Sequence, residues 1–486
     1  MSKRVAVIDI GSNSIRLVVY EKTSRFAFHL LNESKSKVRL SQNAYQNNGN
    51  LCEAAMSRTL DTLRDFLSII ASYKARKTLC IATSALRDAP NKKEFLHRAK
   101  KELKLNIKII DGQKEAYLGA IACANLLPVQ SNSLTIDIGG GSTEFALIND
   151  KDVSNTLSLD LGSVRIKELF CDDRKKDEAI SYIDEKLSVL DSLNASTLIG
   201  IGGTFRAVSS AILARKKHPL NKLHAFSYNA KELDDYLSLV IDATEDELKK
   251  LGIKADRFDV IKPGALILQR VLKKLSIKDI ITSGVGVREG AFLADLLRNS
   301  KDRFPEHYSV STRYILDSHI SEKAIASQLN FLVKKIFDLT HKHLGIDEIY
   351  RRDLSIAAKL YPCGNSIHFY SKNKHSYYIL QSALEYGFTH KQITLISTLC
   401  KYAKKKLPTT SHVQKYKELL PERNILNALN FILSLSVSLV AHRPRNLKYD
   451  FIFEDGVLNI NADESLRLCK ESFNKLDTIE NLKVIL

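Results

Sequence analysis

The sequence predicts two similar α/β domains that face each other, followed by a mostly helical region. Residues 4–20 and 133–148 each read as an apolar strand ending in Asp-Ile-Gly, a turn of small residues and a second apolar strand; Asp9 and Asp137 are 128 residues apart. A duplicated unit at this spacing indicates two related domains. Strands alternate with helices up to about residue 300, as in a parallel or mixed sheet. From about residue 310 glycine is sparse and helical periodicity dominates.

The other elements of the first domain follow from apolar spacing. Residues 51–74 carry leucine, phenylalanine and isoleucine at helical intervals, 78–83 read as a buried strand, and 91–104 as a charged amphipathic helix. Residues 106–110 are a short strand, and residues 111–117 open a helix. The first domain is therefore expected to span residues 1–125.

The second domain is expected over 126–305, and its second half contains the same strand–turn–helix pattern twice. Residues 197–214 predict a strand, a Gly-Gly-Thr turn and a helix, and residues 279–297 predict a strand, a glycine-rich turn and a helix. Segments 321–339 and 391–407 have helical periodicity, which gives a helical domain over 306–445. The final segment, 446–486, is expected to be a small α/β unit with a hairpin over 447–460 that turns at Asp455-Gly456.

Composition places the chain among ordinary globular proteins. Its 486 residues are 44% hydrophobic and 26% charged. No apolar run approaches the roughly 20 residues that span a bilayer, and the apolar N-terminal run is broken by Asp9. We therefore expect a cytoplasmic protein that does not bind a membrane. The seven cysteines include no CxxC pair, so reduced thiols are a better interpretation than disulfides or a zinc ribbon.

The net charge of +18 favours a polyanionic partner such as nucleic acid, polyphosphate or a nucleotide. The alternative is only a basic globular protein. No helix-turn-helix, RNA-recognition or zinc-finger signature is present, so a specific nucleic-acid partner is not expected.

Two loops are candidates for phosphate binding. In the first, Asp9 stands at a strand end and is followed by Gly11, Ser12, Asn13 and Ser14, which expose backbone N–H groups; an ordinary hairpin turn is the alternative. The second loop contains three consecutive glycines, which favour close approach of a ligand to the backbone. Its flanking carboxylates, Asp137 and Glu144, are suited to Mg²⁺. The related loops predict a phosphate held from both sides of an interdomain cleft.

Two further side chains follow predicted strands. Glu115 lies near a helix start, where an acidic residue is either a partner of the helix dipole or a catalytic group. Arg87 has the geometry to bind phosphate in a bidentate manner. The alternative for Arg87 is a surface pair with Asp88.

Six motifs in order give the chain a close resemblance to the Ppx/GppA family of exopolyphosphatases and guanosine pentaphosphate phosphohydrolases. They are VIDIGSNSIRL (7–17), ATSALRDA (82–89), IIDGQKEA (109–116), TIDIGGGSTE (135–144), GIGGTFRA (200–207) and ITSGVGVREG (281–290). The family belongs to the actin-like ATPase and sugar-kinase (ASKHA) superfamily, so the resemblance implies two actin-like domains. It also implies hydrolysis of a terminal phosphoanhydride of polyphosphate or pppGpp, with Mg²⁺ as cofactor and Mn²⁺ as a possible replacement.

The resemblance also implies roles for individual residues. Glu115 is expected to activate the attacking water, Arg87 to clamp phosphate, and Asp137 and Glu144, with Asp9, to hold the metal. The expected phosphate contacts are Gly11, Ser12, Asn13, Ser14, Arg16, Gly139, Gly140, Gly141, Ser142, Thr143, Gly202, Gly203, Thr204 and Arg288. Residues near 202–206 and 284–288 are candidates for substrate selectivity. Long family members are also commonly homodimers.

The C-terminal region resembles the helical HD-like domain of long family members but departs from its pattern. Tyr361-Pro362 replaces the expected metal-binding pair, and Asn365 stands at the next histidine position. Tyrosine and proline do not replace such ligands, so a second metal centre is not expected. Two basic clusters, one over 401–406 and one at Arg443, Arg445 and Lys448, are either solvated faces or polyanion contacts.

Three functions remain open from the sequence. A phosphohydrolase fits the whole motif set, including DGQKEA. A kinase of the same superfamily also holds phosphates between two such loops, and a non-catalytic polyphosphate or nucleotide sensor would keep the binding loops alone. The motifs do not separate polyphosphate from pppGpp as substrate.

Overall fold

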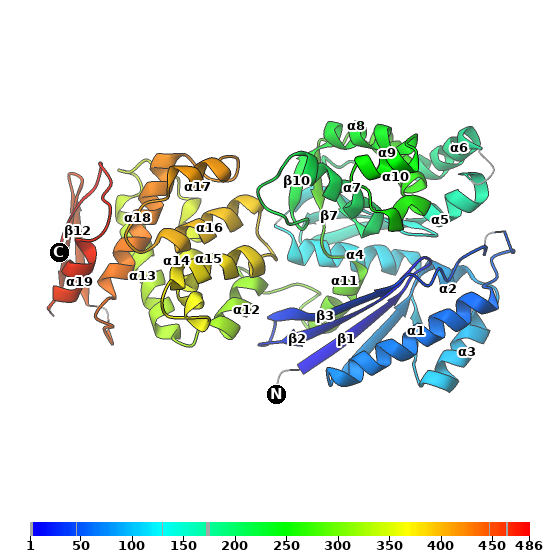
Figure 1. Cartoon of the computed structure of the whole chain (residues 1–486), viewed down its shortest axis with the longest axis horizontal. Helices are drawn as coiled ribbons and strands as arrows, with labels where there is room; N and C mark the ends of the chain where they lie inside the picture. Colours follow the sequence, from blue (N-terminus) through cyan, green and yellow to red (C-terminus); the bar gives the residue numbers. More distant parts are fainter. Residues whose placement is uncertain (1–2, 45, 129, 172–174, 447, 463–464) are drawn as a thin grey trace. The chain divides into compact units, whose positions relative to one another are not determined.

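The computed structural model describes the whole chain except residues 1–2, 45, 129, 172–174, 447 and 463–464 (Figure 1). The chain divides into two compact units, Met1–Tyr308 and Ser309–Leu486. Among the described residues, no helix is long and apolar enough to cross a membrane.

The first sheet of unit 1 has five strands in the order β3-β2-β1-β4-β5. Alternating buried side chains on β1 and β2 pack against α1 and α3, which supply the other half of this core. The elements are β1 (Lys3–Ile10), β2 (Ile15–Lys22), β3 (Phe28–Ser36), α1 (Glu53–Ser72), β4 (Lys77–Ala82), α2 (Ser84–Asp88), α3 (Lys92–Leu103) and β5 (Lys108–Ile109).

The second sheet has six strands in the order β10-β11-β9-β6-β7-β8. Its strands are β6 (Gln130–Ile138), β7 (Thr143–Asp150), β8 (Asp152–Leu159), β9 (Thr197–Ile201), β10 (Phe226–Asn229) and β11 (Asp279–Thr282). The helices around it are α4 (Gly112–Leu126), α5 (Ser163–Ile166), α6 (Lys176–Leu187), α7 (Gly202–Arg215), α8 (Ala230–Ile241), α9 (Glu245–Lys250), α10 (Phe258–Lys274) and α11 (Val287–Leu296), with short helical turns at Lys167–Cys171, Ser188–Ser192 and Ala255–Arg257.

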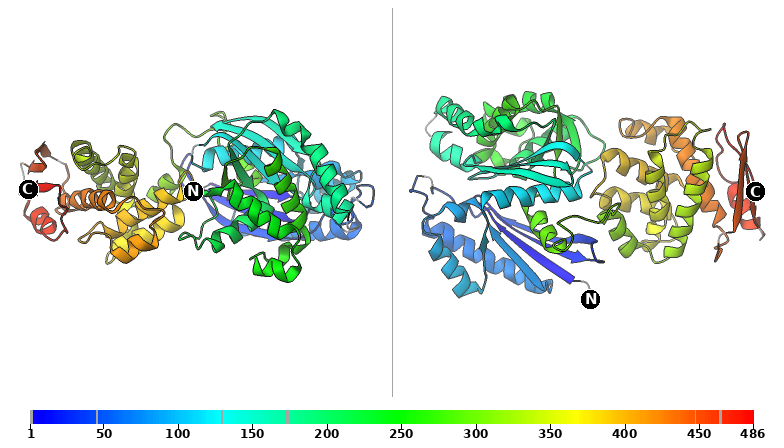
Figure 2. Two further views of the ribbon diagram at one scale, coloured as in Figure 1. Left: turned by 90° about the horizontal axis from the view of Figure 1, so that it is seen from above. Right: turned by 180° about the vertical axis from the view of Figure 1, so that it is seen from behind.

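The topology confirms the predicted duplication and the α/β fold class. The strands of the first sheet correspond in order to β8, β7, β6, β9 and β11 of the second, with β10 added at the edge. In the first hairpin Asp9 pairs across the strands with Arg16, and in the second Asp137 pairs with Glu144. Cross-strand partners share one face of a sheet. Each hairpin therefore presents two charged side chains at its turn end. Helix α4 packs against β7, β8 and α11 (Figure 2).

Unit 2 is helical, as predicted, with a small sheet at its C-terminal end. Its helices are α12 (Val310–His319), α13 (Lys323–Thr340), α14 (Tyr350–Leu360), α15 (Lys372–Ala383), α16 (His390–Tyr402), α17 (Thr410–Lys415), α18 (Arg423–Leu439) and α19 (Arg467–Phe473), with a short turn at Tyr361–Ser366. The sheet has the order β12-β13-β14, formed by β12 (Tyr449–Glu454), β13 (Val457–Ala462) and β14 (Lys483–Ile485).

Several boundaries differ from the sequence prediction. The hairpin turn at Asp455-Gly456 is confirmed, with positive φ at both residues; Leu447, where the hairpin was expected to begin, lies outside the described residues. The predicted Gly-Gly-Thr turn after residue 201 is wrong, because α7 begins at Gly202 itself. The predicted helix over 391–407 ends at Tyr402, and the Leu407 N–H instead donates to the Asp477 carboxylate. Strand β5 has only two residues.

Candidate active site

A cleft of about 150 Å³ lies in unit 1 where the turn ends of the two sheets meet. Both glycine loops line it, together with the starts of α4, α7 and α11. The predicted residues in its wall are Asp9, Gly11, Ser12, Asn13, Ser14, Arg16, Glu115, Asp137, Gly139, Gly140, Ser142, Glu144, Gly202, Gly203, Thr204 and Arg288.

The two loops close in the same way. The Gly11 N–H donates to the Ser14 carbonyl over 3.3 Å, and the Gly139 N–H donates to the Ser142 carbonyl over 2.9 Å. The loops also contact each other, since a Cβ added to Gly140 would lie 2.8 Å from the Cβ of Ser12. Small residues are therefore required by contact between the lobes as well as by approach of a ligand.

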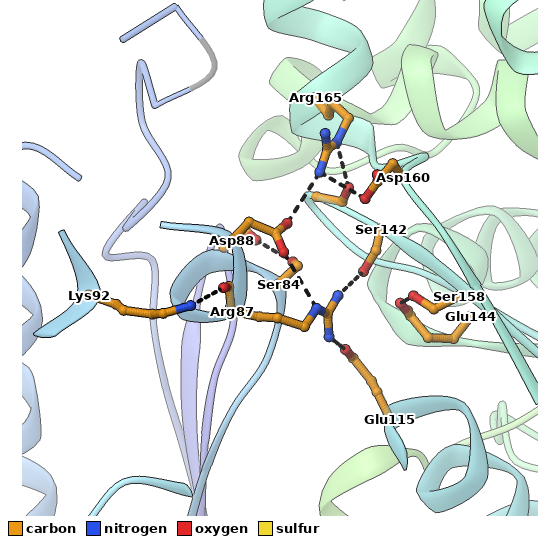
Figure 3. A network of polar contacts seen from close by, with 12 residues as sticks. Ser84, Arg87, Asp88, Lys92, Glu115, Ser142, Glu144, Ser158, Asp160 and Arg165 are labelled. Carbon is orange, nitrogen blue, oxygen red and sulfur yellow. Dashed lines mark hydrogen bonds and ion pairs between the residues drawn. The ribbon is translucent and has the colours of Figure 1, made fainter. Parts of the chain in front are cut away.

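Of the four carboxyl groups that line the cleft, three lie on the two hairpins, and burial disfavours the charged form of each. Burial raises the pKa of Asp137 to about 6 and that of Glu144 to about 8. Burial also raises the pKa of Asp9, against the lowering effect of Arg288 and Arg16. The Ser158 hydroxyl donates to Glu144 Oε1 over 2.9 Å and orients that carboxyl (Figure 3). A cation bound in the cleft would stabilise the ionised forms of these carboxyl groups and so offset the cost of their burial.

Glu115 is placed by the capped start of α4. The Asp111 side chain accepts the Lys114 N–H over 2.7 Å, and Glu115 lies in the first helical turn. Burial and then the charge of Glu144 raise the pKa of Glu115 well above its ordinary range, while Arg87 lowers it.

Arg87 connects Glu115 to the second glycine loop (Figure 3). Its Nη1 donates to Glu115 Oε2 over 3.0 Å, and its Nη2 donates to Ser142 Oγ over 3.4 Å. The pair with Asp88 also exists, at 3.5 Å, but Asp88 is shared with Arg165 at 3.2 Å. The surface-pair interpretation of Arg87 therefore describes only part of its contacts.

Four arginines line the cleft, namely Arg16, Arg206, Arg257 and Arg288. Arg288 donates to Glu33 Oε1 over 2.7 Å, and Arg16 donates to the same oxygen over 3.3 Å. Arg206 donates to the carbonyl oxygens of Ser283 and Val285. Burial and repulsion from Arg288 and Arg206 lower the pKa of Arg16 to about 10. Acidic groups act on this cluster in turn, with Glu289 acting on Arg206 and Arg288, and Glu33 and Asp9 acting on Arg16, so the guanidinium groups are partly neutralised before a ligand binds.

The start of α7 completes the wall. Gly202 has φ of +80°, and a Cβ there would lie 2.2 Å from Asp137 Oδ1. A Cβ on Gly203 would lie 2.6 Å from Arg257 Nη2. The first N–H groups of a helix have no partner within the helix, so they carry partial positive charge toward the cleft.

Three of the predicted site residues, Arg87, Gly141 and Thr143, are not among the residues that line the cleft. Arg87 contacts Glu115 and Ser142, as described. The Thr143 hydroxyl donates to the Leu161 carbonyl, while the Gly141 carbonyl accepts from Arg165 Nε over 2.8 Å. These contacts brace the loop. The sequence reasoning assigned no role to Glu33, Ser84, Ser163, Arg165 or Arg257, and treated Arg206 only as a selectivity candidate.

The carboxylates fit the magnesium ion that the resemblance implies. Among the described residues, no three acidic, histidine or cysteine side chains are grouped closely enough to hold a metal by themselves. Mg²⁺ at phosphoryl-transfer sites is typically held by one or two carboxylates, with waters and substrate oxygens completing its shell. The cross-strand pair of Asp137 and Glu144, desolvated in the cleft, is a donor set of that kind.

Comparison with known proteins identifies two matching family descriptions. The sequence model of the Ppx/GppA phosphatase family matches residues 18–299. A second model, Ppx/GppA phosphatase, domain III, matches residues 308–476.

Individual relatives agree with these matches. A bifunctional 3-dehydroquinate synthase/phosphatase of Fusobacterium nucleatum is 34% identical over 310 residues, covering 59% of this chain but only 46% of that protein. A guanosine-5'-triphosphate,3'-diphosphate pyrophosphatase of Pseudoalteromonas atlantica is 28% identical over 465 residues, covering 92% of this chain and 88% of the relative. The crystal structure of an exopolyphosphatase from Cytophaga hutchinsonii superposes with a TM-score of 0.57 at 27% identity, covering 62% of this chain and 100% of that structure.

Proposed function

The chain belongs to the Ppx/GppA phosphatase family, and on that basis we propose that it hydrolyses the terminal phosphoanhydride bond of inorganic polyphosphate, of pppGpp, or of both. Orthophosphate is the released product. The observation that carries the proposal is the convergence, in one cleft, of two backbone loops, four arginines and a buried glutamate paired with a fifth arginine, Arg87.

The cleft binds the terminal phosphate through positive partial and full charges. The two glycine loops and the start of α7 line the cavity, and their backbone N–H groups are the proposed phosphate donors, apart from those of Gly11 and Gly139, which donate within their own loops. Arg16, Arg206 and Arg288 neutralise the phosphate chain. Glu33 holds Arg16 and Arg288 together before substrate arrives, so that both guanidinium groups are oriented toward one anion.

Glu115 accepts the proton of the attacking water. Its burial and the nearby Glu144 make its carboxylate more basic than an exposed one, which suits a proton acceptor near neutral pH. Arg87 holds the side chain through Oε2 and leaves the other carboxylate oxygen for the water. No histidine or cysteine is among the described residues that line the cleft. We therefore expect direct attack by water without a covalent enzyme intermediate.

Asp137 and Glu144, with Asp9 nearby, would hold Mg²⁺, and Mn²⁺ would be an acceptable replacement. When bound, the ion neutralises negative charge on the transferred phosphoryl group and the leaving phosphate.

The relatives' names do not favour the two alternatives, a kinase or a non-catalytic sensor. The relatives include both a pppGpp pyrophosphatase and an exopolyphosphatase, so the cleft is proposed for the bond that these substrates share. A homodimer and a cytoplasmic location remain predictions; light scattering of the purified chain and fractionation of cells test them.

The proposal is tested by measuring orthophosphate release with Mg²⁺ from long-chain polyphosphate and from pppGpp, at matched concentrations of terminal phosphate. Release from either substrate is expected, and the ratio of kcat/KM identifies the preferred one. Binding of both substrates without release from either would favour the sensor. Phosphate transfer to an acceptor other than water would favour the kinase.

A further inference from the structure

Another pocket lies within unit 2, at the position where the helical domain departs from the family's metal-binding pattern. Tyr361, Pro362 and Asn365 form part of its wall, and its volume is about 600 Å³. Pockets of roughly 300–1,000 Å³ are typical of small-molecule sites.

The wall of this pocket is strongly cationic. The two basic clusters of the sequence meet here, since Lys404 and Lys405 line the same cavity as Arg443. Five cations, Lys372, Lys404, Lys405, Arg443 and Lys475, face one carboxylate, Glu471, which itself pairs with Arg467 at 3.4 Å. Among the described residues the four lysines form no ion pair, and Arg443 pairs with the exposed Glu322 at 2.7 Å. Burial, and the charges of Arg443 and Lys404, lower the pKa of Lys372.

Aromatic rings stand beside these cations. Phe369 and Tyr370 are 65% and 75% exposed, an unusual state for neighbouring aromatic residues, and their ring centroids are 5.6 Å apart. The Lys372 ammonium lies 5.6 Å from the Phe369 ring and 5.5 Å from that of Tyr361. Asn365 Oδ1 is buried without a hydrogen-bond partner in the described structure. The pocket thus offers stacking surfaces, an unused acceptor and cations together.

We propose that this pocket binds a nucleoside polyphosphate, with the base against Phe369 and Tyr370 and the phosphates against Lys404, Lys405 and Arg443. The cations alone would suit any phosphate chain. The exposed rings favour a ligand with a base, because every nucleobase presents a flat face for stacking, whereas inorganic polyphosphate has none. Asn365 Oδ1 is an acceptor for a base or ribose donor.

The test uses the full chain and nucleotides that its own activity would not consume. The β,γ-imido analogues of GTP and ATP are the nucleotide probes, and inorganic tripolyphosphate is the probe without a base. All binding is measured with EDTA in place of Mg²⁺, so that the tripolyphosphate is not hydrolysed. Binding is measured by calorimetry, and an azido derivative of the tighter-binding nucleotide is photo-crosslinked to the wild-type protein and mapped by peptide sequencing. Crosslinks between residues 361 and 475 are expected.

Two pairs of exposed substitutions separate the parts of the proposal. Phe369→Ala with Tyr370→Ala is expected to weaken nucleotide binding at this site at least tenfold and to leave tripolyphosphate binding unchanged. Lys404→Glu with Lys405→Glu is expected to abolish binding of both probes there. The matched controls are Tyr378→Ala, which removes a 69% exposed ring outside the pocket, and Lys391→Glu, which reverses an exposed charge outside it. Both controls should bind like the wild type.

Three results would overturn the inference. Crosslinks confined to residues 1–308 would place nucleotide binding in the catalytic cleft alone. If the Phe369→Ala, Tyr370→Ala variant bound nucleotide with the same affinity as the wild type, the proposed stacking of the base on these two rings would be wrong. Loss of self-association in that variant, with no nucleotide bound by the wild type in unit 2, would instead make the rings an interface between copies of this chain.

Discussion

Gly202→Ala tests how closely the start of α7 controls the cleft. Gly202 has φ of +80°, where an L-residue costs roughly 1–2 kcal/mol. Its new Cβ would lie 2.2 Å from Asp137 Oδ1, whereas ordinary contact begins at 3.4 Å, so the carboxylate must move by about 1.2 Å. Because a misplacement of about 1 Å in an active site costs on the order of 100-fold, we expect kcat/KM for orthophosphate release to fall by about that factor.

Gly252→Ala is the matched control for this prediction. Gly252 also has a left-handed φ, +86°, but a Cβ there meets only Ala211, at an ordinary 3.6 Å. Urea unfolding should show a loss of about 1–2 kcal/mol in Gly252→Ala and a larger loss in Gly202→Ala, because its Cβ also displaces the buried Asp137 carboxyl. With both variants assayed while folded, only Gly202→Ala should lose activity. Equal kcat/KM in the two variants would refute the link between Gly202, Asp137 and turnover.

Three other substitutions or conditions test separate parts of the structure. Arg87→Lys should lower kcat by about 100-fold with little change in unfolding, because an ammonium does not bridge Glu115 and Ser142 as the guanidinium does; an unchanged kcat would show that the bridge is dispensable. Gly290→Ala should destabilise unit 1 by about 3 kcal/mol in urea unfolding, since its Cβ would overlap the Leu118 carbonyl, 1.9 Å away, between α11 and α4; wild-type stability would contradict that packing. Burial and the charges of Lys401 and Lys415 lower the pKa of His412 to about 4. Between pH 6.5 and 4 the unfolded chain therefore binds more protons than the folded chain, and stability is lost as the pH falls through that window. His412→Gln should show a shallower loss of stability over the same range, and an identical slope would contradict this assignment.

The repeat made the fold and half of the cleft predictable. The two hairpins differ by a constant offset, which aligns Asp9 with Asp137 and also Arg16 with Glu144. One pair joins a carboxylate to an arginine and the other joins two carboxylates, so the duplicated scaffold carries cationic and acidic faces at equivalent places. These four positions could be predicted from the sequence because each hairpin is one contiguous segment of strand, turn and strand.

The rest of the cleft depends on contacts between distant segments. Glu33 is on the edge strand β3 and meets Arg288, which is 255 residues further along the chain. Arg257 precedes α10 in a segment with no glycine motif, and only the fold brings it beside Gly203. Arg87 was predicted only in part, because its neighbour Asp88 is visible in the sequence, whereas its ion pair with Glu115 joins side chains 28 residues apart that only the fold brings together.

The most direct test of the proposed site compares Glu115→Gln with Glu94→Gln, a control at an exposed glutamate of α3. Orthophosphate release and equilibrium binding are measured for each on the preferred substrate. The proposed role of Glu115 as the base predicts that Glu115→Gln binds substrate with a Kd within a few-fold of the wild type and loses at least about 100-fold in kcat, while Glu94→Gln is unchanged in both. Wild-type turnover in Glu115→Gln would contradict that role.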